Sequence, residues 1–403
     1  MRCRTVVTGL GVVSAVGVGT DVFWRATTTG ATGLAPASPE LAAVGARVAG
    51  AIKGFSGAAY LKNARHSRVL NRTFELLVVA GALAATDAGL GAVPVPPARL
   101  GIVTGIGPIN QYTDDLMTAA REASNESGFD VARFAETARA LYPLRRLRLL
   151  PNVGAALLAI EHHAMGPSLT FVSGHTTGLQ AIGQGLAMIR EGRLDAVLCG
   201  GADARLTPLD LRLFHAQCPL SPSDDPDRAC RPFDLHRNGV VAGEGAAMLL
   251  IETEDSARIR RAEPYAELVS CASAGPTEGG CSESMRLAIS ARRGGRPDVI
   301  VAHGEGGVQS DRLEAAAIDL IAPRWVTCLQ SVVGHTMSAC GALNVIAACL
   351  ILADERVPSI RSLRSPEIPL PYVTHPLAER FDSVVVNALE PGNAAWSALL
   401  ARA

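Results

Sequence analysis

The sequence has no excess of charge of either sign, because 37 Lys and Arg residues face 38 Asp and Glu residues for a net charge of −1. This balance argues against nucleic acid or a membrane surface as the main partner. Lysine itself is almost missing, with Lys53 and Lys62 as its only occurrences, and we attribute this to coding bias rather than to chemistry. The chain also lacks low-complexity segments and short repeats, so we expect a globular protein.

The nine cysteines lack the regular spacing that disulfide frameworks and metal sites need, and no CxxC pair occurs. We therefore expect reduced thiols and a cytoplasmic protein. No stretch reaches the ~18 uninterrupted apolar residues of a spanning helix, which argues against a membrane segment. The start, "MRCRTVVTGLGVVSAVG", has the basic and apolar parts of a signal peptide, but Gly9, Gly11 and Gly17 interrupt it. A buried first strand is the expected structure there.

Short β-branched runs alternate with longer alanine-rich runs along most of the chain. This alternation predicts an α/β fold whose buried strands are covered on both faces. Strands are expected at 4–13, 100–107, 168–174, 195–203, 245–252, 264–273, 298–304 and 382–388. Helices are expected from 74 to Gly89 and at 154–166, 179–193, 313–322 and 340–354.

Two segments depart from this alternation. The polar, charged stretch from Tyr112 to Arg148 predicts a surface excursion or an interface. A charge-rich break between Glu252 and Pro264 divides the chain, so we expect one half at 1–252 and a second half at 253–403.

The segment "GPSLTFVSGHTTG" places small, turn-prone residues between a predicted strand and a predicted helix. Such a strand-to-helix elbow often presents a nucleophilic serine or cysteine, but the residue at this tip is His175. The positive end of the helix dipole lowers the pKa of an imidazole, so we expect His175 to be neutral.

Further strings accompany the elbow: "TVVTGLGVVSAVG", "GRLDAVLCGGADA", "CRPFDLHRNGVVAGEGAAMLLIE", "VAHGEGGVQSDRLEA" and "QSVVGHTMSACGALN". In this order, and over nearly the whole chain, they closely resemble the β-ketoacyl synthases of fatty-acid and type II polyketide assembly. The resemblance implies the thiolase fold, in which two related βα halves form a five-layered α-β-α-β-α sandwich. It also implies a dimer.

The resemblance implies a site in which the elbow carries an acyl-accepting cysteine, whose position falls on His175. The two histidines of the family match His303 and His335. A cysteine at a helix N-terminus has a stabilised thiolate, and two imidazoles can donate hydrogen bonds to the enolate formed when malonyl loses carbon dioxide.

Four departures separate this chain from a condensing enzyme. His175 replaces the nucleophile, and Gln330 stands at the position of the family's lysine. Glu305 replaces a usual threonine, although Asp311 and Glu314 keep the acidic pair. The phenylalanine gate is replaced by "ALEPGNAAW", where Leu389 and Pro391 stand instead, and Phe214 is a further pocket candidate. Loss of a nucleophile costs about 10⁶ in rate, or ~8 kcal/mol.

Three interpretations of His175 remain open from the sequence: a packing residue, a group that polarises malonyl for decarboxylation, or a zinc ligand together with His303 and His335. A deep apolar pocket with no evident carboxylate beside it disfavours zinc, so we expect neither a metal nor a cofactor. Cys218 is a possible substitute nucleophile, but its loop position disfavours this role.

These departures resemble the chain-length factor, or KSβ, a non-condensing subunit that usually carries glutamine at the cysteine position. The resemblance implies a cysteine-bearing ketosynthase (KSα) as heterodimer partner and an acyl carrier protein as second partner. The run around Arg145, Arg146 and Arg148 is either a solvated face or a docking site for the acidic carrier. The alternatives are a malonyl-carrier-protein decarboxylase or acyltransferase using His175, His303 and His335, and a homodimeric scaffold.

Overall fold

The computed structural model describes residues 4–109, 113–126, 128–141, 143–277, 279–291 and 295–403. Its main sheet has eleven strands, in the order β13-β12-β16-β17-β11-β1-β10-β9-β5-β8, with the short β2 paired to β1. The N-terminal strands are β1 (Thr5–Ser14), β5 (Leu100–Ile106), β8 (Ser168–Val172), β9 (Ala196–Asp203) and β10 (Gly245–Thr253). The C-terminal strands are β11 (Ala266–Ala274), β12 (Val299–Val301), β13 (Trp325–Thr327), β16 (Ser383–Leu389) and β17 (Ala395–Ala401).

β1 joins the two groups of strands. It pairs antiparallel with β10 along most of its length, and two further residue pairs, Val6 with Glu267 and Val7 with Ala266, connect it to β11. Every residue of β1 is buried, which agrees with the predicted first strand. Both groups therefore belong to one continuous hydrogen-bonded sheet.

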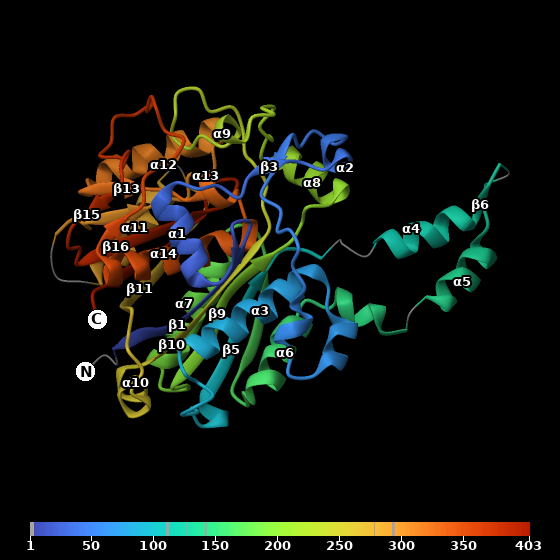
Figure 1. Ribbon diagram of the computed structural model, residues 1–403, viewed down its shortest axis with the longest axis horizontal. Helices are drawn as coiled ribbons and strands as arrows, with labels where there is room; N and C mark the ends of the chain where they lie inside the picture. The colour runs from blue at the N-terminus through green and yellow to red at the C-terminus, as the bar shows by residue number, and fades with distance from the viewer. Residues whose placement is uncertain (1–3, 110–112, 127, 142, 278, 292–294) are drawn as a thin grey trace.

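The helices form three layers, one between the two groups of strands and one on the outer face of each group. Helices α3 (Arg72–Asp87) and α6 (Val153–His162) cover the outer face of the N-terminal strands, and α11 (Gly280–Ser290) and α12 (Val308–Ile321) cover the C-terminal strands. Helices α7 (Thr177–Arg190) and α14 (Cys340–Asp354) contact each other between the two groups (Figure 1). The arrangement is the five-layered α-β-α-β-α order, so the predicted fold class is confirmed.

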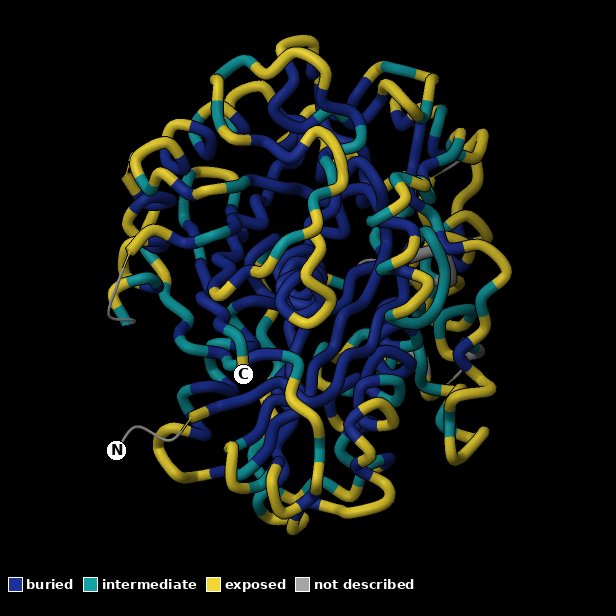
Figure 2. The backbone as a smooth tube through the Cα atoms, turned by 60° about the vertical axis from the view of Figure 1, so that its left-hand side comes forward, coloured by how far each residue is buried: buried dark blue, intermediate teal, exposed yellow. Residues whose placement is uncertain are grey.

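The central layer contains a strongly apolar helix, α14. Residues Met337–Asp354, which include α14, are long and apolar enough to cross a membrane by composition, but 89% of them are buried inside the protein. Figure 2 shows the buried central chain enclosed by exposed loops. Because α14 contacts strands of both groups, none of its faces needs polar side chains for contact with solvent. It is therefore a core helix.

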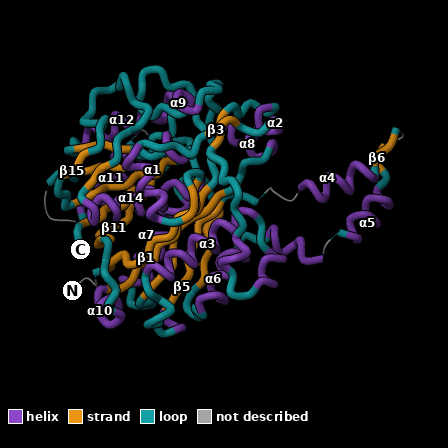
Figure 3. The backbone as a smooth tube through the Cα atoms, in the orientation of Figure 1, coloured by secondary structure: helices purple, strands orange, loops and turns teal. Residues whose placement is uncertain are grey.

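The predicted surface excursion is an arm that leaves the body. It contains α4 (Thr113–Glu122), β6 (Ser124–Asn125), β7 (Gly128–Phe129), α5 (Val131–Ala140) and the 3₁₀ turn η4 (Pro143–Leu149). Its helices lie away from the rest of the chain (Figures 1 and 3). Tyr112, the first residue of the predicted excursion, lies outside the described residues.

Two predicted features differ in detail. The break between Glu252 and Pro264 contains a helix, α10 (Glu254–Arg260), whose Arg260 forms a buried ion pair with Glu252. The last strand, β17, is not predicted from the sequence. Its residues, AWSALLA, mix small and apolar types and give only a weak two-residue periodicity.

Candidate functional site

The elbow connects β8 to α7 and carries His175 at its tip, 3% exposed. The backbone amides of His175 and Thr176 donate to the carboxylate of Glu390, at 3.0 and 2.8 Å, and the Thr176 hydroxyl donates to it at 2.7 Å. Glu390 follows β16, so a distant segment holds the elbow. The two amides that directly precede α7 are thus already occupied by a carboxylate of the same chain.

His303 stands in the loop after β12, and two acids of α12 hold this loop. Glu314 accepts from the backbone amides of His303 and Gly304, both at 2.8 Å. Asp311 accepts from the amides of Glu305, Gly306 and Phe233. The acidic pair therefore fixes the backbone that aims His303 and Glu305 inward. Burial is the main cause that raises the pKa of Asp311 to about 7.

His335 follows the short helix α13 (Gln330–Val333) and is fully buried. Its Nδ1 accepts a hydrogen bond from the Met337 amide at 3.1 Å, and Met337 adopts a positive φ of 50°. A neutral ring whose Nδ1 accepts must carry its hydrogen on Nε2. His335 is therefore held as an Nε2–H donor pointing into the site.

The three histidines converge, as predicted. The ring centroids of His175 and His335 are 4.3 Å apart, those of His303 and His335 are 5.1 Å apart, and Nε2 of His335 is 3.3 Å from Nε2 of His303. The Phe214 ring of α8 (Pro208–Gln217) packs 5.7 Å from His175 and 5.5 Å from His335. The site has one apolar wall and three imidazoles.

A carboxylate lies beside the imidazoles, which differs from the expectation drawn from the sequence. Oε2 of Glu305 is 3.4 Å from Nε2 of His335 and 3.6 Å from Nε2 of His303. The turn that directs it inward needs Gly304 and Gly306, which adopt positive φ values of 43° and 86°.

The charges follow from this contact. Burial opposes ionisation of Glu305, but its interactions with His303, His335 and Ser310 outweigh burial and lower its pKa to about 2. Burial also opposes protonation of His303, yet Glu305 holds the pKa of His303 above its usual value. Burial and the neighbouring His303 and Arg205 place the pKa of His175 well below its usual range, so the predicted neutral ring agrees.

The site opens into a cavity of about 430 Å³. Its lining includes His303, Glu305, Leu389, Glu390 and Pro391, so the residues that replace the family's gate do border the pocket. Cys218 also lines it, but burial raises the pKa of this thiol far above neutral, which disfavours a nucleophilic role. The remaining described cysteines are free thiols as well.

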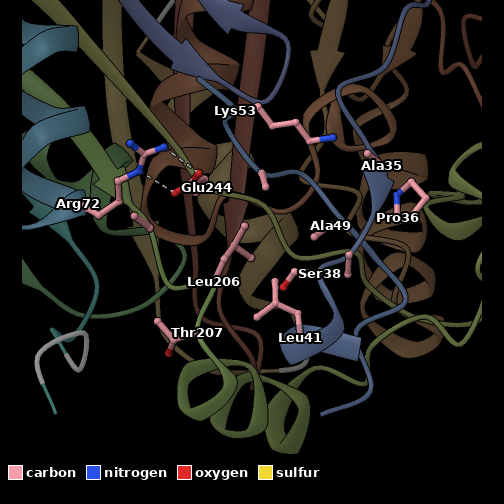
Figure 4. Close-up of a pocket in the computed structure, with 13 residues that line it drawn as sticks. Ala35, Pro36, Ser38, Leu41, Ala49, Lys53, Arg72, Leu206, Thr207 and Glu244 are labelled. Carbon is pink, nitrogen blue, oxygen red and sulfur yellow. Dashed lines mark hydrogen bonds and ion pairs between the residues drawn. The ribbon is translucent and has the colours of Figure 1, made fainter. Parts of the chain in front are cut away.

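A larger cavity of about 620 Å³ lies elsewhere, between β3 (Ala35–Pro36), α8 and the start of α3. Figure 4 shows its charged groups: Lys53, and Arg72 paired with Glu244 at 3.2 Å. No histidine or cysteine is among its described lining residues, whereas Cys218 and His303 line the smaller cavity.

Among the other predicted site residues, Gln330 and Arg148 form hydrogen bonds with residues other than the three histidines. Gln330 is buried at the start of α13, where its Oε1 is 3.2 Å from the sulfur of Cys328. Arg146 and Arg148 lie on η4 at the base of the arm, and Arg148 donates to the Arg68 carbonyl. The side chain of Arg145 lies outside the described part of the chain.

Sequence reasoning missed one residue of this site. Glu390 stands between Leu389 and Pro391, both of which were considered, but its contact with the elbow spans 215 positions. The sequence feature that could have indicated its role is an acidic residue in the segment that replaces the phenylalanine gate.

Comparison with known proteins agrees with this geometry. Residues 3–257 match the family described as β-ketoacyl synthase, N-terminal domain, and residues 280–364 match the β-ketoacyl synthase, C-terminal domain. The chain belongs to the β-ketoacyl synthase family. It is a ketosynthase-family protein of the type II polyketide synthase kind.

Relatives of this β-ketoacyl synthase family member cover nearly the whole chain. The tetracenomycin polyketide synthase ketoacyl synthase alpha subunit of Streptomyces glaucescens is 31% identical, over 99% of this chain and 97% of that protein. The 3-oxoacyl-acyl-carrier-protein synthase 2 of Vibrio cholerae is 29% identical, over 90% and 89%. The structure of the ishigamide ketosynthase/chain length factor superposes with a TM-score of 0.87 at 26% identity, with both chains fully covered.

Proposed function

We propose that this chain is a non-condensing chain-length factor, which pairs with a cysteine-bearing ketosynthase in type II polyketide biosynthesis and shapes the pocket for the growing acyl chain. The observation that carries the proposal is the elbow. An imidazole stands where the acyl-carrying sulfur is expected, and the Glu390 carboxylate holds the two amides beside it. Condensation needs a thiolate and free amides for a developing oxyanion, and a carboxylate at this point opposes both.

The surface supports a partner subunit. β8 is an edge strand, and its residues Leu169 and Val172 are exposed by 37% and 45%. The arm exposes Met117, Phe129 and Val131, three large apolar side chains, although it makes few contacts with the body (Figure 3). An open strand edge and an apolar arm are features that a second subunit covers in an obligate interface.

Two features support a heterodimer and a carrier protein rather than a lone chain. A subunit without its nucleophile has a role in chain extension only beside one that retains it. The Vibrio cholerae relative is named as a 3-oxoacyl-acyl-carrier-protein synthase, and we extend carrier-bound acyl groups as the substrate class to the pair. The arginines of η4 are the proposed docking residues for the acidic carrier, and the reduced cysteines support a cytoplasmic location.

Co-expression with a cysteine-bearing type II ketosynthase from the same source tests the proposal. We expect one complex with equal amounts of both chains on size-exclusion chromatography. Incubation with malonyl carrier protein should then add an acyl mass to the partner and none to this chain. Acylation and extension by the purified chain alone would disprove the proposal.

A malonyl-carrier-protein decarboxylase is the second candidate, because His335 is held as a donor beside His303. Acetyl carrier protein formed by the chain alone, and lost in His303→Ala, would favour it. A homodimeric scaffold would instead give a stable two-copy particle without the partner and no acetyl product.

A further inference from the structure

Four buried side chains from separate parts of the sequence form a compact group: His175, His303, Glu305 and His335. Each offers one nitrogen or oxygen atom, and these four atoms all lie within 4.8 Å of one another. The elbow supplies the first side chain, the loop after β12 supplies the second and third, and the segment after α13 supplies the last.

The spacing suits a tetrahedral metal ion. Bonds of about 2.1 Å to zinc place neighbouring ligand atoms about 3.4 Å apart. The separation between Glu305 Oε2 and His303 Nε2 is 3.6 Å. The nitrogen that His175 offers lies within 4.8 Å of both groups.

The protein alone does not satisfy these rings. Nδ1 of His175 and Nδ1 of His303 are buried, and neither has a hydrogen-bond partner among the described residues. Unpartnered buried nitrogens are costly, and they are rare unless a function requires them. A bound metal ion is one partner that would satisfy such a nitrogen.

His335 has a different role from the other three. Because its Nδ1 accepts from the Met337 amide, its Nε2 carries the hydrogen and has no lone pair for a metal. The ligand set is therefore two histidines and one glutamate, and His335 places an N–H donor beside them, with its Nε2 3.4 Å from Glu305 Oε2. Two histidines, one glutamate and a water are a known zinc arrangement with an open position.

The surroundings favour a cation. The Glu305 carboxylate lies beside two of the imidazoles, and the carboxylate of Glu390 offsets the positive end of α7 beside His175. His303 and Glu305 both line the cavity of about 430 Å³, which provides a path for an ion and for water.

We propose that His175, His303 and Glu305 bind a divalent transition-metal ion, with Zn²⁺ as the first candidate, and that His335 donates from Nε2 to a water in the fourth position. This inference concerns the single chain and does not depend on the proposed partner. The histidine at the elbow, which removes the acyl-carrying group, would then supply a ligand.

Co²⁺ binding to the full-length chain tests the proposal. The protein is purified with a tag that contains no histidine, treated with a chelator, and titrated with Co²⁺, whose visible absorption reports four- or five-coordinate nitrogen and oxygen ligands. We expect about one ion per chain, displacement of the absorption by one equivalent of Zn²⁺, and a higher Tm with the metal.

Variants make the assignment specific. Glu305→Gln and His175→Gln should each abolish the absorption band and the metal-dependent rise in Tm. His236→Gln removes an exposed imidazole outside the group and should leave both unchanged. If Glu305→Gln does not fold, Glu305→Asp keeps the charge, and it should bind the ion more weakly. No absorption with the wild type, or an unchanged band in the Glu305 and His175 variants, would overturn the proposal.

Discussion

The carboxylate of Glu390 packs against Gly174 so closely that a β-carbon at position 174 would collide with both of its oxygens. Gly174 therefore belongs to the same arrangement as the two elbow amides that Glu390 accepts from. The elbow of this chain is shaped around a carboxylate rather than around a substrate carbonyl.

Restoring the nucleophile should not restore its reactivity. In His175→Cys the thiol would belong to the residue whose backbone amide already donates to the Glu390 carboxylate, and this nearby negative charge opposes formation of the thiolate. Adding Glu390→Gln should lower the thiol pKa and speed its alkylation by iodoacetamide about tenfold at pH 7, the equivalent of one pKa unit. The rates are measured by mass spectrometry of the peptide that contains position 175.

Glu390→Gln without the cysteine is the matched control, because it reports alkylation of the native thiols. Equal alkylation rates for His175→Cys alone and for His175→Cys combined with Glu390→Gln would show that Glu390 does not control the reactivity of a thiol at position 175.

Asp311→Ala should destabilise the protein by about 3–5 kcal/mol, because it leaves three backbone amides without their buried acceptor and removes one of the ion-pair partners of Arg237. Urea denaturation followed by circular dichroism measures the change. Asp255→Ala removes an exposed partner of Arg258 and should stay within about 0.5 kcal/mol of the wild type. A similar loss in both variants would contradict the buried role of Asp311.

His162 should make the fold sensitive to acid. Burial, and then the charge of Lys62, lower the pKa of His162 to about 4, below the ordinary value of 6.5. The unfolded chain therefore binds a proton between pH 6.5 and pH 4 that the folded chain rejects, and stability falls as the pH drops through this window. We expect a loss of about 2–3 kcal/mol from this group.

Urea midpoints at pH 7 and pH 4.5 measure the effect. His162→Gln should reduce the difference between the two midpoints, whereas His375→Gln, which alters an exposed residue, should not. An unchanged difference in His162→Gln would exclude this histidine as the source.

The edge strand β8 should decide partner binding. Leu169→Glu places a charge on the exposed edge and should prevent the complex with the ketosynthase partner from forming. Leu320→Glu alters a leucine on α12 that is 67% exposed and should leave the complex intact. Co-purification and size-exclusion chromatography compare the two, and retention of the complex in Leu169→Glu would place the interface elsewhere.

The sequence was sufficient to predict what short-range patterns encode. The β-branched and alanine-rich runs gave most strands and helices, and the resemblance of several strings to a known family implied that His175, His303 and His335 meet in one site. The roles of the site residues remain predictions.

Long-range side-chain directions were beyond sequence reasoning. Glu305 could be identified as a departure, but its inward direction depends on the two glycine turns around it. The contact of Glu390 with the elbow depends on how the end of β16 meets the start of α7, which no local pattern encodes. Both acids contact the elbow or its neighbouring histidines directly, whereas the side chain of Gln330 contacts Cys328.

The shared strand β1 has a mechanical consequence. Because it is hydrogen-bonded to both groups of strands, β1 resists a swing of one group away from the other. Residues 390–393 lie along the rim of the cavity, so a shift of this segment would widen the entrance and leave the pairing of the sheet intact.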